Sequence, residues 1–270
     1  TGSSTVFQNI GSTSNTGFEL MITSTNISGK DFSWTTDFNF YTNKEKIVSL
    51  LTDDDMVGNK WFIGRPVGVE YDYEKLGIWQ LDKADDASKF GQKPGDVRLK
   101  DQNGDGKVDA DNDRIVLGQT SPKFGAFLRN SFMFKGFTFS FALEGKFGQM
   151  ISSSTLGGDL FFDGTRWGPA ALAGNYWTPD NPGGEYPYVN RAVEARVNLY
   201  GFRNGSYLNV QELSLGYNFS KIKHVRSLNV YARVKNPFYL YRKDKALDPQ
   251  APNFNYAAFR TSVIGLSVNL

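Results

Sequence analysis

The chain has 270 residues and is nearly neutral, with 30 Lys and Arg against 28 Asp and Glu. This balance gives no reason to expect a nucleic-acid partner. The lack of cysteine excludes a disulfide scaffold, a Cys-ligated metal and thiol catalysis. A single histidine, His224, leaves little room for a His-rich metal site. No apolar run approaches the roughly 18 residues of a membrane helix, so a helical membrane protein is excluded.

The composition combines many aromatic residues with a polar average. Phe, Tyr and Trp make up 15% of the chain, although its mean hydropathy is only −0.41. An all-β soluble protein can have this composition. A membrane β-barrel can have it too, because its lipid-facing and water-facing residues alternate.

Apolar and polar residues alternate with a period of two along seven segments, which predicts seven strands. The segments are Gly17–Asn26, Asp31–Tyr41, Lys123–Phe134, Gly136–Gly148, Ser206–Phe219, Ser227–Lys235 and Arg260–Leu270. In the fourth of them, Phe137 and Phe139 alternate with Thr138 and Ser140. None of the ten prolines falls inside a segment, as expected for strands. Lengths of about 9–14 residues suit tilted strands that cross a bilayer better than the strands of most globular sheets.

The connections between these strands alternate between short and long. Short turns follow the first, third and fifth strands, whereas the other connections are the long segments 42–122, 149–205 and 236–259. A soluble sandwich would have mostly short connections. Outer-membrane barrels have short periplasmic turns and long extracellular loops. We therefore expect an all-β protein in which residues 42–122 and 149–205 are long extracellular loops.

Seven strands do not close a bacterial barrel, which has an even number of strands and at least about eight. A seven-stranded open sheet in lipid would also leave unpaired backbone groups at both edges. The sequence therefore predicts that residues 1–270 are the C-terminal segment of a large transmembrane β-barrel. Polar residues of its strands should line a wet interior: Asp37, Asn39, Arg129 and Glu144.

The sharpest local motif is the segment 101–113, which is rich in Asp and Asn. As in an EF-hand-type calcium loop, side-chain oxygens occupy its positions 1, 3, 5 and 9, Gly106 occupies position 6, and position 7 offers a backbone carbonyl. The candidate ligands are Asp101, Asn103, Asp105, Lys107, Asp109, Asn112 and Asp113. Asn112 stands where such loops have glutamate, and the alternative interpretation is a turn that binds nothing. We expect a structural Ca²⁺ that braces a long loop.

Aromatic residues are frequent in the long connections: Trp61, Trp79, Trp167, Trp177, Tyr186 and Tyr188. They could stack on sugar rings or hold a peptide, but we favour packing of the loops on one another. The runs Asp53–Asp55 and Asp85–Asp86 lack the spacing of a glycosidase acid and nucleophile. His224 is interpreted as a solvated turn residue, and no Walker-type loop, GxSxG or HExxH sequence occurs. We therefore expect no catalytic residues and no enzyme.

Motifs along nearly the whole chain follow one another in a familiar order. They are Asn9–Gly11, Asn15–Leu20, Asp31–Val48, Gly77–Gln80, Pro94–Asp96 leading into Asp101–Asp113, Ser121–Phe124, Tyr207–Asn218 and Val230–Phe238. In this order they resemble the SusC/RagA family of TonB-dependent outer-membrane transporters. The resemblance implies a barrel of about 22 strands, of which these are the last seven. It also implies an N-terminal plug domain, absent from this chain, and the outer membrane of a Gram-negative, Bacteroidetes-like bacterium.

The resemblance implies partners as well. In this family a SusD-like surface lipoprotein caps the barrel, and the pair imports oligosaccharides or peptides with energy delivered by TonB through the N-terminal part of the transporter. The remaining partners would be the rest of the same barrel and outer-membrane lipid. The chain departs from many barrels by ending in Leu270 instead of an aromatic residue.

Two other functions remain open from the sequence. One is a soluble, calcium-braced β-rich surface adhesin or glycan-binding module. The other, weaker one is a hydrolase. Membrane partitioning separates the first of these from a transporter, because only the transporter should need detergent.

Overall fold

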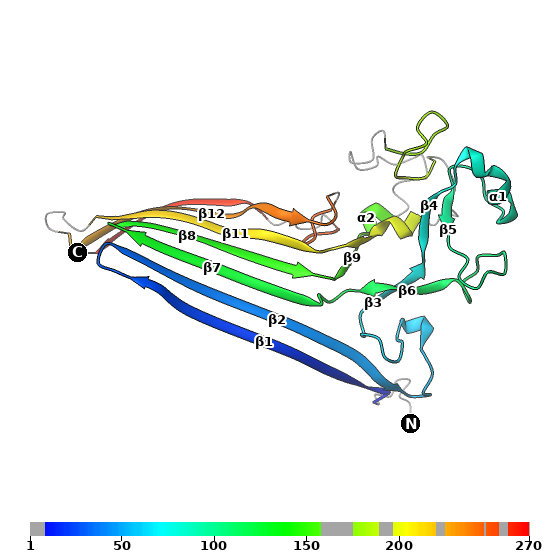
Figure 1. The fold of residues 1–270 in the computed structure, drawn as a ribbon, viewed down its shortest axis with the longest axis horizontal. Helices are drawn as coiled ribbons and strands as arrows, with labels where there is room; N and C mark the ends of the chain where they lie inside the picture. The colour runs from blue at the N-terminus through cyan, green and yellow to red at the C-terminus, as the bar shows by residue number, and fades with distance from the viewer. Residues whose placement is uncertain are drawn as a thin grey trace, which may run out of the picture. The chain divides into compact units, whose positions relative to one another are not determined.

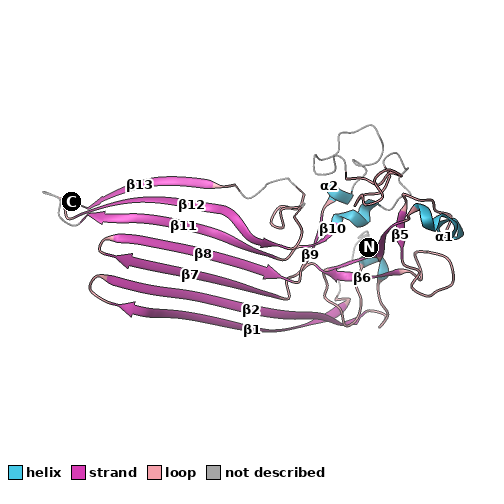
Figure 2. Cartoon of the chain, turned by 45° about the horizontal axis from the view of Figure 1, so that its top comes forward, coloured by secondary structure: helices cyan, strands magenta, loops and turns pink. Residues whose placement is uncertain are grey.

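The computed structural model describes residues 9–157, 175–188, 197–219, 225–245, 247–253 and 259–269. Its main feature is one seven-stranded antiparallel sheet in the order β1–β2–β7–β8–β11–β12–β13 (Figure 1). The strands are β1 (Gly11–Ser28), β2 (Phe32–Leu50), β7 (Phe124–Phe134), β8 (Phe137–Phe147), β11 (Tyr207–Phe219), β12 (Ser227–Arg242) and β13 (Thr261–Asn269). All seven predicted strands are therefore confirmed, and they belong to one sheet (Figure 2).

Three strands are longer than predicted. β1 begins at Gly11 instead of Gly17, β2 continues to Leu50 instead of Tyr41, and β12 continues to Arg242 instead of Lys235. The prediction was wrong because at β1 and β2 it stopped where the apolar alternation stops, and at β12 it stopped just before Pro237. A strand can keep its backbone pairing after its side chains have become polar on both faces.

Pro237 lies inside β12, although the sequence predicts strands free of proline. The ladder between β11 and β12 has an irregularity at this level, between Val210 and Glu212, and Asn236 has a φ of 49°. Pairing of β12 with β13 has also ended at Lys235. Proline is tolerated here because its missing N–H interrupts no regular ladder.

The turn between β7 and β8 consists of two residues, as predicted. Lys135 and Gly136 both have positive φ, 46° and 91°. Positive φ at both central residues defines the type I′ turn, whose twist matches that of the two strands that it joins. This turn fixes the register of the hairpin from Phe134–Phe137 to Phe124–Phe147.

The long connections contain structure of their own. In the first, β3 (Val69–Tyr73) pairs with β6 (Arg114–Gln119) and β4 (Lys75–Ile78) with β5 (Val97–Leu99). The second contains β9 (Met150–Ser152), paired with β10 (Phe202–Asn204). Short helices complete them: 3-10 turns at Val57–Asn59, Leu81–Lys83 and Val197–Gly201, α1 (Ala84–Lys89) and α2 (Ser154–Gly157). None of the helices in the described ranges is long and apolar enough to cross a membrane.

The chain divides into two compact units. The sheet unit comprises Gly17–Asn43, Pro122–Gln149 and Asn204–Leu270. The loop unit comprises Lys44–Ser121 and Met150–Arg203 together with the residues up to Thr16. Each unit is described by itself below.

The loop unit has a small core to which both long connections contribute. The first connection supplies Val97 and Leu99, and the second supplies Tyr186, Leu199 and Tyr200, all of them buried. Burial raises the pKa of the Tyr200 phenol well above its usual range. The two connections therefore fold together as one body instead of forming two separate loops.

Candidate functional site

One face of the seven-stranded sheet is apolar. Residues that are partners across neighbouring strands share a face of a sheet. One such row crosses β2, β7, β8, β11 and β12 and contains only apolar side chains: Phe38, Leu128, Leu143, Val210 and Phe238. Many side chains of this face are exposed, for example Phe137 at 55%, Leu215 at 57% and Ile264 at 84%. A large exposed apolar surface of this kind marks a contact with a protein or a membrane.

The opposite face is polar. The row next to the apolar one contains Asp37, Arg129, Ala142, Glu212 and Lys235 on the same five strands. Charges of opposite sign thus stand beside each other on neighbouring strands.

The four residues predicted for a wet interior share this polar face. Asp37 and Arg129 are cross-strand partners, and Asn39 and Glu144 both stand opposite Phe127. That this face lines a wet interior stays a prediction. Tyr207 and Gln211 donate to the Glu144 carboxylate, so at least this residue belongs to a hydrogen-bonded group.

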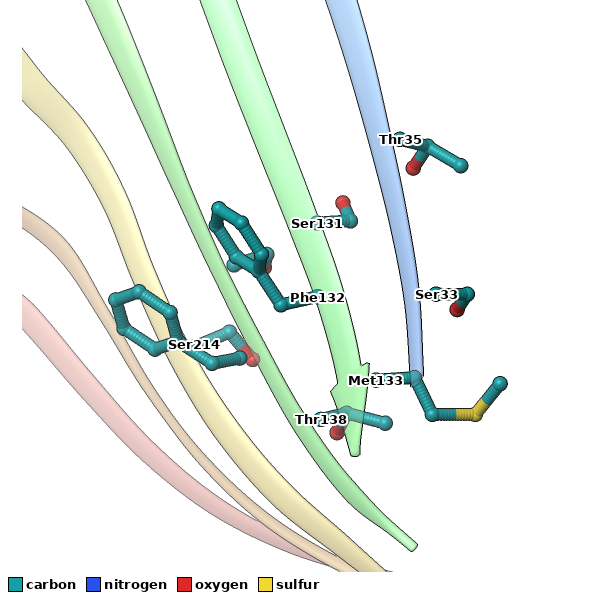
Figure 3. Close-up of a pocket in the computed structure, with 9 residues that line it drawn as sticks. Ser33, Thr35, Ser131, Phe132, Met133, Thr138 and Ser214 are labelled. Atoms are coloured by element: carbon teal, nitrogen blue, oxygen red, sulfur yellow. The ribbon is translucent and has the colours of Figure 1, made fainter. Parts of the chain in front are cut away.

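A shallow depression of about 230 Å³ lies in the sheet between β2, β7, β8 and β11 (Figure 3). Short hydroxyl side chains form most of its lining: Ser33, Thr35, Ser131, Thr138, Ser140 and Ser214. Register places Thr35, Ser131, Ser140 and Ser214 in one row on the polar face. These hydroxyls donate and accept hydrogen bonds without adding charge, so this part of the wall suits neutral polar groups.

The connection after β12 packs onto the polar face, which the sequence did not predict. The Tyr239 hydroxyl donates to Asp248 Oδ1 at 2.5 Å, and Gln250 Nε2 donates to the Tyr207 hydroxyl at 3.3 Å. Leu247 is completely buried. The segment 247–251 therefore covers the ends of β11 and β12 on the polar side. No sequence periodicity marks such a contact, because Asp248 and Gln250 resemble ordinary loop residues.

A small polar group interrupts the apolar face. Asn130 is only 7% exposed, and its Oδ1 accepts hydrogen bonds from Trp34 Nε1 and Thr36 Oγ1, each at 2.7 Å. Thr36 in turn accepts from Asn26 Nδ2 at 2.7 Å. The side chains satisfy one another, which is the condition under which polar groups are tolerated in apolar surroundings.

Side chains of the predicted calcium loop 101–113 form hydrogen bonds with the backbone of the same loop. Asp101 accepts from the backbone N–H groups of Gly104 and Gly106, at 2.6 and 2.8 Å. Asn103 and Asp105 each accept from the N–H two residues later. Gly104 and Gly106 have φ of 77° and 83°, so the sharp turn expected at Gly106 is confirmed.

Asp109 and Asp113 brace the second half of this loop. Asp113 is fully buried and accepts from the N–H groups of Gln102 and Asp109, both at 2.7 Å. Backbone and side-chain hydrogen bonds from Asn112 hold the pKa of the Asp109 carboxyl below its usual range. Within the described ranges, no three His, Cys, Asp or Glu side chains gather closely enough to hold a metal ion. Calcium binding at 101–113 stays a prediction.

Packing of the loop unit by aromatic residues, as favoured from the sequence, is confirmed for Trp79, Trp177 and Tyr186. Trp79 and Trp177 are 5% and 3% exposed. Trp177 belongs to the second connection, and its Nε1 donates to Gln80 Oε1 of the first at 3.0 Å. Tyr186 lies in the shared core, whereas Tyr188 is 41% exposed and packs edge-on to Trp177. Trp167, His224 and Leu270 lie outside the described residues.

Curated relatives cover almost the whole chain. It is 27% identical to TonB-dependent receptor P39 of Formosa agariphila, over 99% of its own length and 31% of that protein. It is 31% identical to TonB-dependent receptor P3 of the same organism, over 80% of its length and 23% of that protein. Identity to TonB-dependent receptor SusC of Bacteroides thetaiotaomicron is 26%, over 97% of the chain and 27% of that protein. No family model matches the chain.

Solved structures share the fold. The RagAB peptide transporter matches with a TM-score of 0.69 and 22% identity, over 97% of this chain and 30% of the matched chain. The RagAB peptide importer in the open-open state matches with a TM-score of 0.72. The chain thus spans less than a third of the length of the proteins that it matches.

A two-faced antiparallel sheet, matched along its length by receptor barrels, defines the class of this protein: it has the fold of part of a TonB-dependent receptor β-barrel. Within that class the chain is similar in sequence to TonB-dependent receptor SusC and shares the fold of the RagAB transporter, in line with the resemblance of its motifs. These relatives are receptors and transporters, not enzymes.

Proposed function

We propose that the seven-stranded sheet is part of the wall of an import barrel in the outer membrane of a Bacteroidetes-like bacterium. The observation that carries this proposal is the opposite chemistry of the two faces. The exposed apolar face suits contact with hydrocarbon, and the charged and hydroxyl-bearing face suits a water-filled interior. A soluble adhesin would instead bury its apolar face against a second layer.

The edges of the sheet support further strands from the same protein. β1 and β13 are its end strands, each with a neighbour on one side only among the described residues. Unpaired backbone groups in a bilayer cost several kcal/mol each, so a wall in lipid has to continue. We infer that the rest of the barrel pairs with these edges, and that a plug domain and the contact with TonB belong to that remaining part.

The proposed activity is TonB-dependent import together with a SusD-like lipoprotein. SusC and RagAB are the relatives that support this partnership. The substrate class proposed for the whole transporter is an oligosaccharide or a peptide. We also propose a structural Ca²⁺ in the loop 101–113, supported by its EF-hand-like spacing and by the turn at Gly106.

Two substitutions at neighbouring positions test the membrane wall. Leu215 is on the apolar face and Ser214, beside it on β11, is on the polar face. In the full-length protein, Leu215→Lys should destabilise the folded barrel by up to about 2–4 kcal/mol, because the charge enters lipid. Ser214→Lys should be tolerated, because its charge enters water. Urea unfolding in lipid vesicles, followed by heat-modifiable gel migration, measures both effects.

The opposite pattern would contradict a membrane wall. If Leu215→Lys left stability unchanged and the protein stayed soluble without detergent, the adhesin interpretation would replace it. Import itself is tested in cells by uptake of a fluorescent oligosaccharide or peptide, which should stop when TonB is removed.

A further inference from the structure

The loop unit contains a pocket of about 300 Å³ at the start of β1 and the end of β2. Its apolar lining comes from Ile47, Leu50, Trp61 and Val67. Its polar lining comes from Asn9, Ser12, Thr13 and Ser49. An apolar floor with a few hydrogen-bonding groups is the usual construction of a small-molecule site, and this volume is at the lower end of the range for such sites.

The backbone around Trp61, which lines this pocket, is held by hydrogen bonds on both sides of the residue. Its backbone forms a bridge with Met56, which closes a tight turn in which Lys60 has a φ of 59°. The next residues are fixed as well, because the N–H of Ile63 donates to Asp55 Oδ1 at 2.7 Å and Gly64 bonds to Ile47 at 2.8 Å. A backbone that is already ordered reduces the entropy lost when a ligand binds.

The indole N–H of Trp61 is available to a ligand. In the described part of the chain, Trp34, Trp79 and Trp177 each donate this hydrogen to a side-chain amide oxygen. Within the same described residues the indole N–H of Trp61 donates no such hydrogen bond. Ser12 and Ser49 share a hydrogen bond of 2.7 Å across the pocket lining, and each hydroxyl keeps further bonding capacity.

The lining carries no charged side chain. A carboxylate or ammonium group entering it would lose hydration without gaining a counter-charge, which is costly. An aliphatic side chain of a peptide would leave the hydroxyls and the amide of Asn9 unpaired. A neutral sugar ring meets both requirements, because its C–H face fits the apolar floor and its hydroxyls fit the polar side chains.

We propose that this pocket binds one pyranose ring of a neutral oligosaccharide, with the ring against Trp61 and its hydroxyls toward Asn9, Ser12 and Ser49. The proposal rests on the proposed function, because only a barrel in the outer membrane would put this pocket outside the membrane. It goes beyond that function by assigning a sugar site to named residues.

Binding measurements on the full-length transporter in detergent test the site. The probes are neutral hexasaccharides of glucose, mannose, galactose and xylose, an oligogalacturonate, and an uncharged hexapeptide, each titrated by calorimetry. We expect at least one neutral hexasaccharide to bind, and Trp61→Ala to weaken it at least about fivefold, as truncation of an aromatic anchor does. Trp61→Phe keeps a ring without the N–H and should give an intermediate loss.

Tyr176→Ala is the matched control, because Tyr176 is an exposed aromatic residue of the loop unit outside the pocket. It should bind like the parent, and heat-modifiable migration should confirm that all variants are folded. Equal binding by the parent and Trp61→Ala would overturn the site, as would binding only of the uronate or the peptide, or of no probe. If TonB-dependent uptake continued despite such a result, the sugar site would fail while the import function stood.

Discussion

Asn130 offers the most exact test of how the apolar face is built. It accepts hydrogen bonds from Trp34 Nε1 and Thr36 Oγ1 at 2.7 Å each. In Asn130→Ala the indole N–H of Trp34 loses its acceptor in apolar surroundings, whereas Thr36 keeps its contact with Asn26. An orphaned buried donor costs about 1–3 kcal/mol, and each lost hydrogen bond about 0.5–1.5 kcal/mol. We therefore expect the free energy of unfolding to fall by about 2–4 kcal/mol.

The assay is urea unfolding of the full-length barrel in lipid vesicles, with tryptophan fluorescence and heat-modifiable migration as two readouts. Asn39→Ala, on the polar face, is the control and should stay within about 0.5 kcal/mol of the parent. Trp34→Phe removes the indole N–H but keeps a ring on Phe132, with which Trp34 stacks at 5.8 Å. In that background Asn130→Ala should cost about half as much, because neighbours that share a hydrogen bond are not additive. An equal cost in both backgrounds would refute this explanation.

Three further predictions concern other parts of the chain. A Cβ at Gly125 would lie 2.5 Å from Cζ of Tyr41, so Gly125→Ala should lower the free energy of unfolding in urea by about 1–3 kcal/mol. Adding Tyr41→Ala should restore the stability if the clash is the cause, and an unrestored stability would refute it. Ca²⁺ should raise the Tm of the full-length protein but not that of Asp105→Ala. A parent protein whose Tm does not change with Ca²⁺ would contradict the calcium site. Hydrogen bonds from Gln102 and Lys100 hold the pKa of Glu74 below its ordinary 4.5. The ionised Glu74 carboxylate therefore stabilises the fold above pH 4.5, and this contribution is lost as the pH falls through the lower pKa of the folded state. Glu74→Gln should remove this part of the dependence of stability on pH, and an unchanged dependence would contradict the prediction.

The strands could be predicted because apolar and polar residue types indicate which face of the sheet each side chain occupies. Phe137 and Phe139 alternate with Thr138 and Ser140, and every one of them ends on the expected face. The ends of the strands could not be predicted, since the polar residues after Tyr41 show no alternation even though β2 continues to Leu50.

The polar group at Asn130 and the core of the loop unit had no local signal. Thr36 and Asn130 are 94 positions apart in the sequence, and only their pairing across β2 and β7 explains why a polar pair is stable on an apolar face. Val97 and Tyr200 meet only because both long connections fold together. For the calcium loop, the spacing predicted the turn at Gly106, but it did not reveal that Asp113 is buried and binds two backbone N–H groups.

The shared core of the two long connections limits how the loop unit can diversify. Val97 and Leu99 depend on Tyr186, Leu199 and Tyr200 from the other connection for their burial. A graft that transfers one connection into a relative would carry half a core and expose it to water. Evolution and protein engineering alike must therefore exchange the two connections as a matched pair.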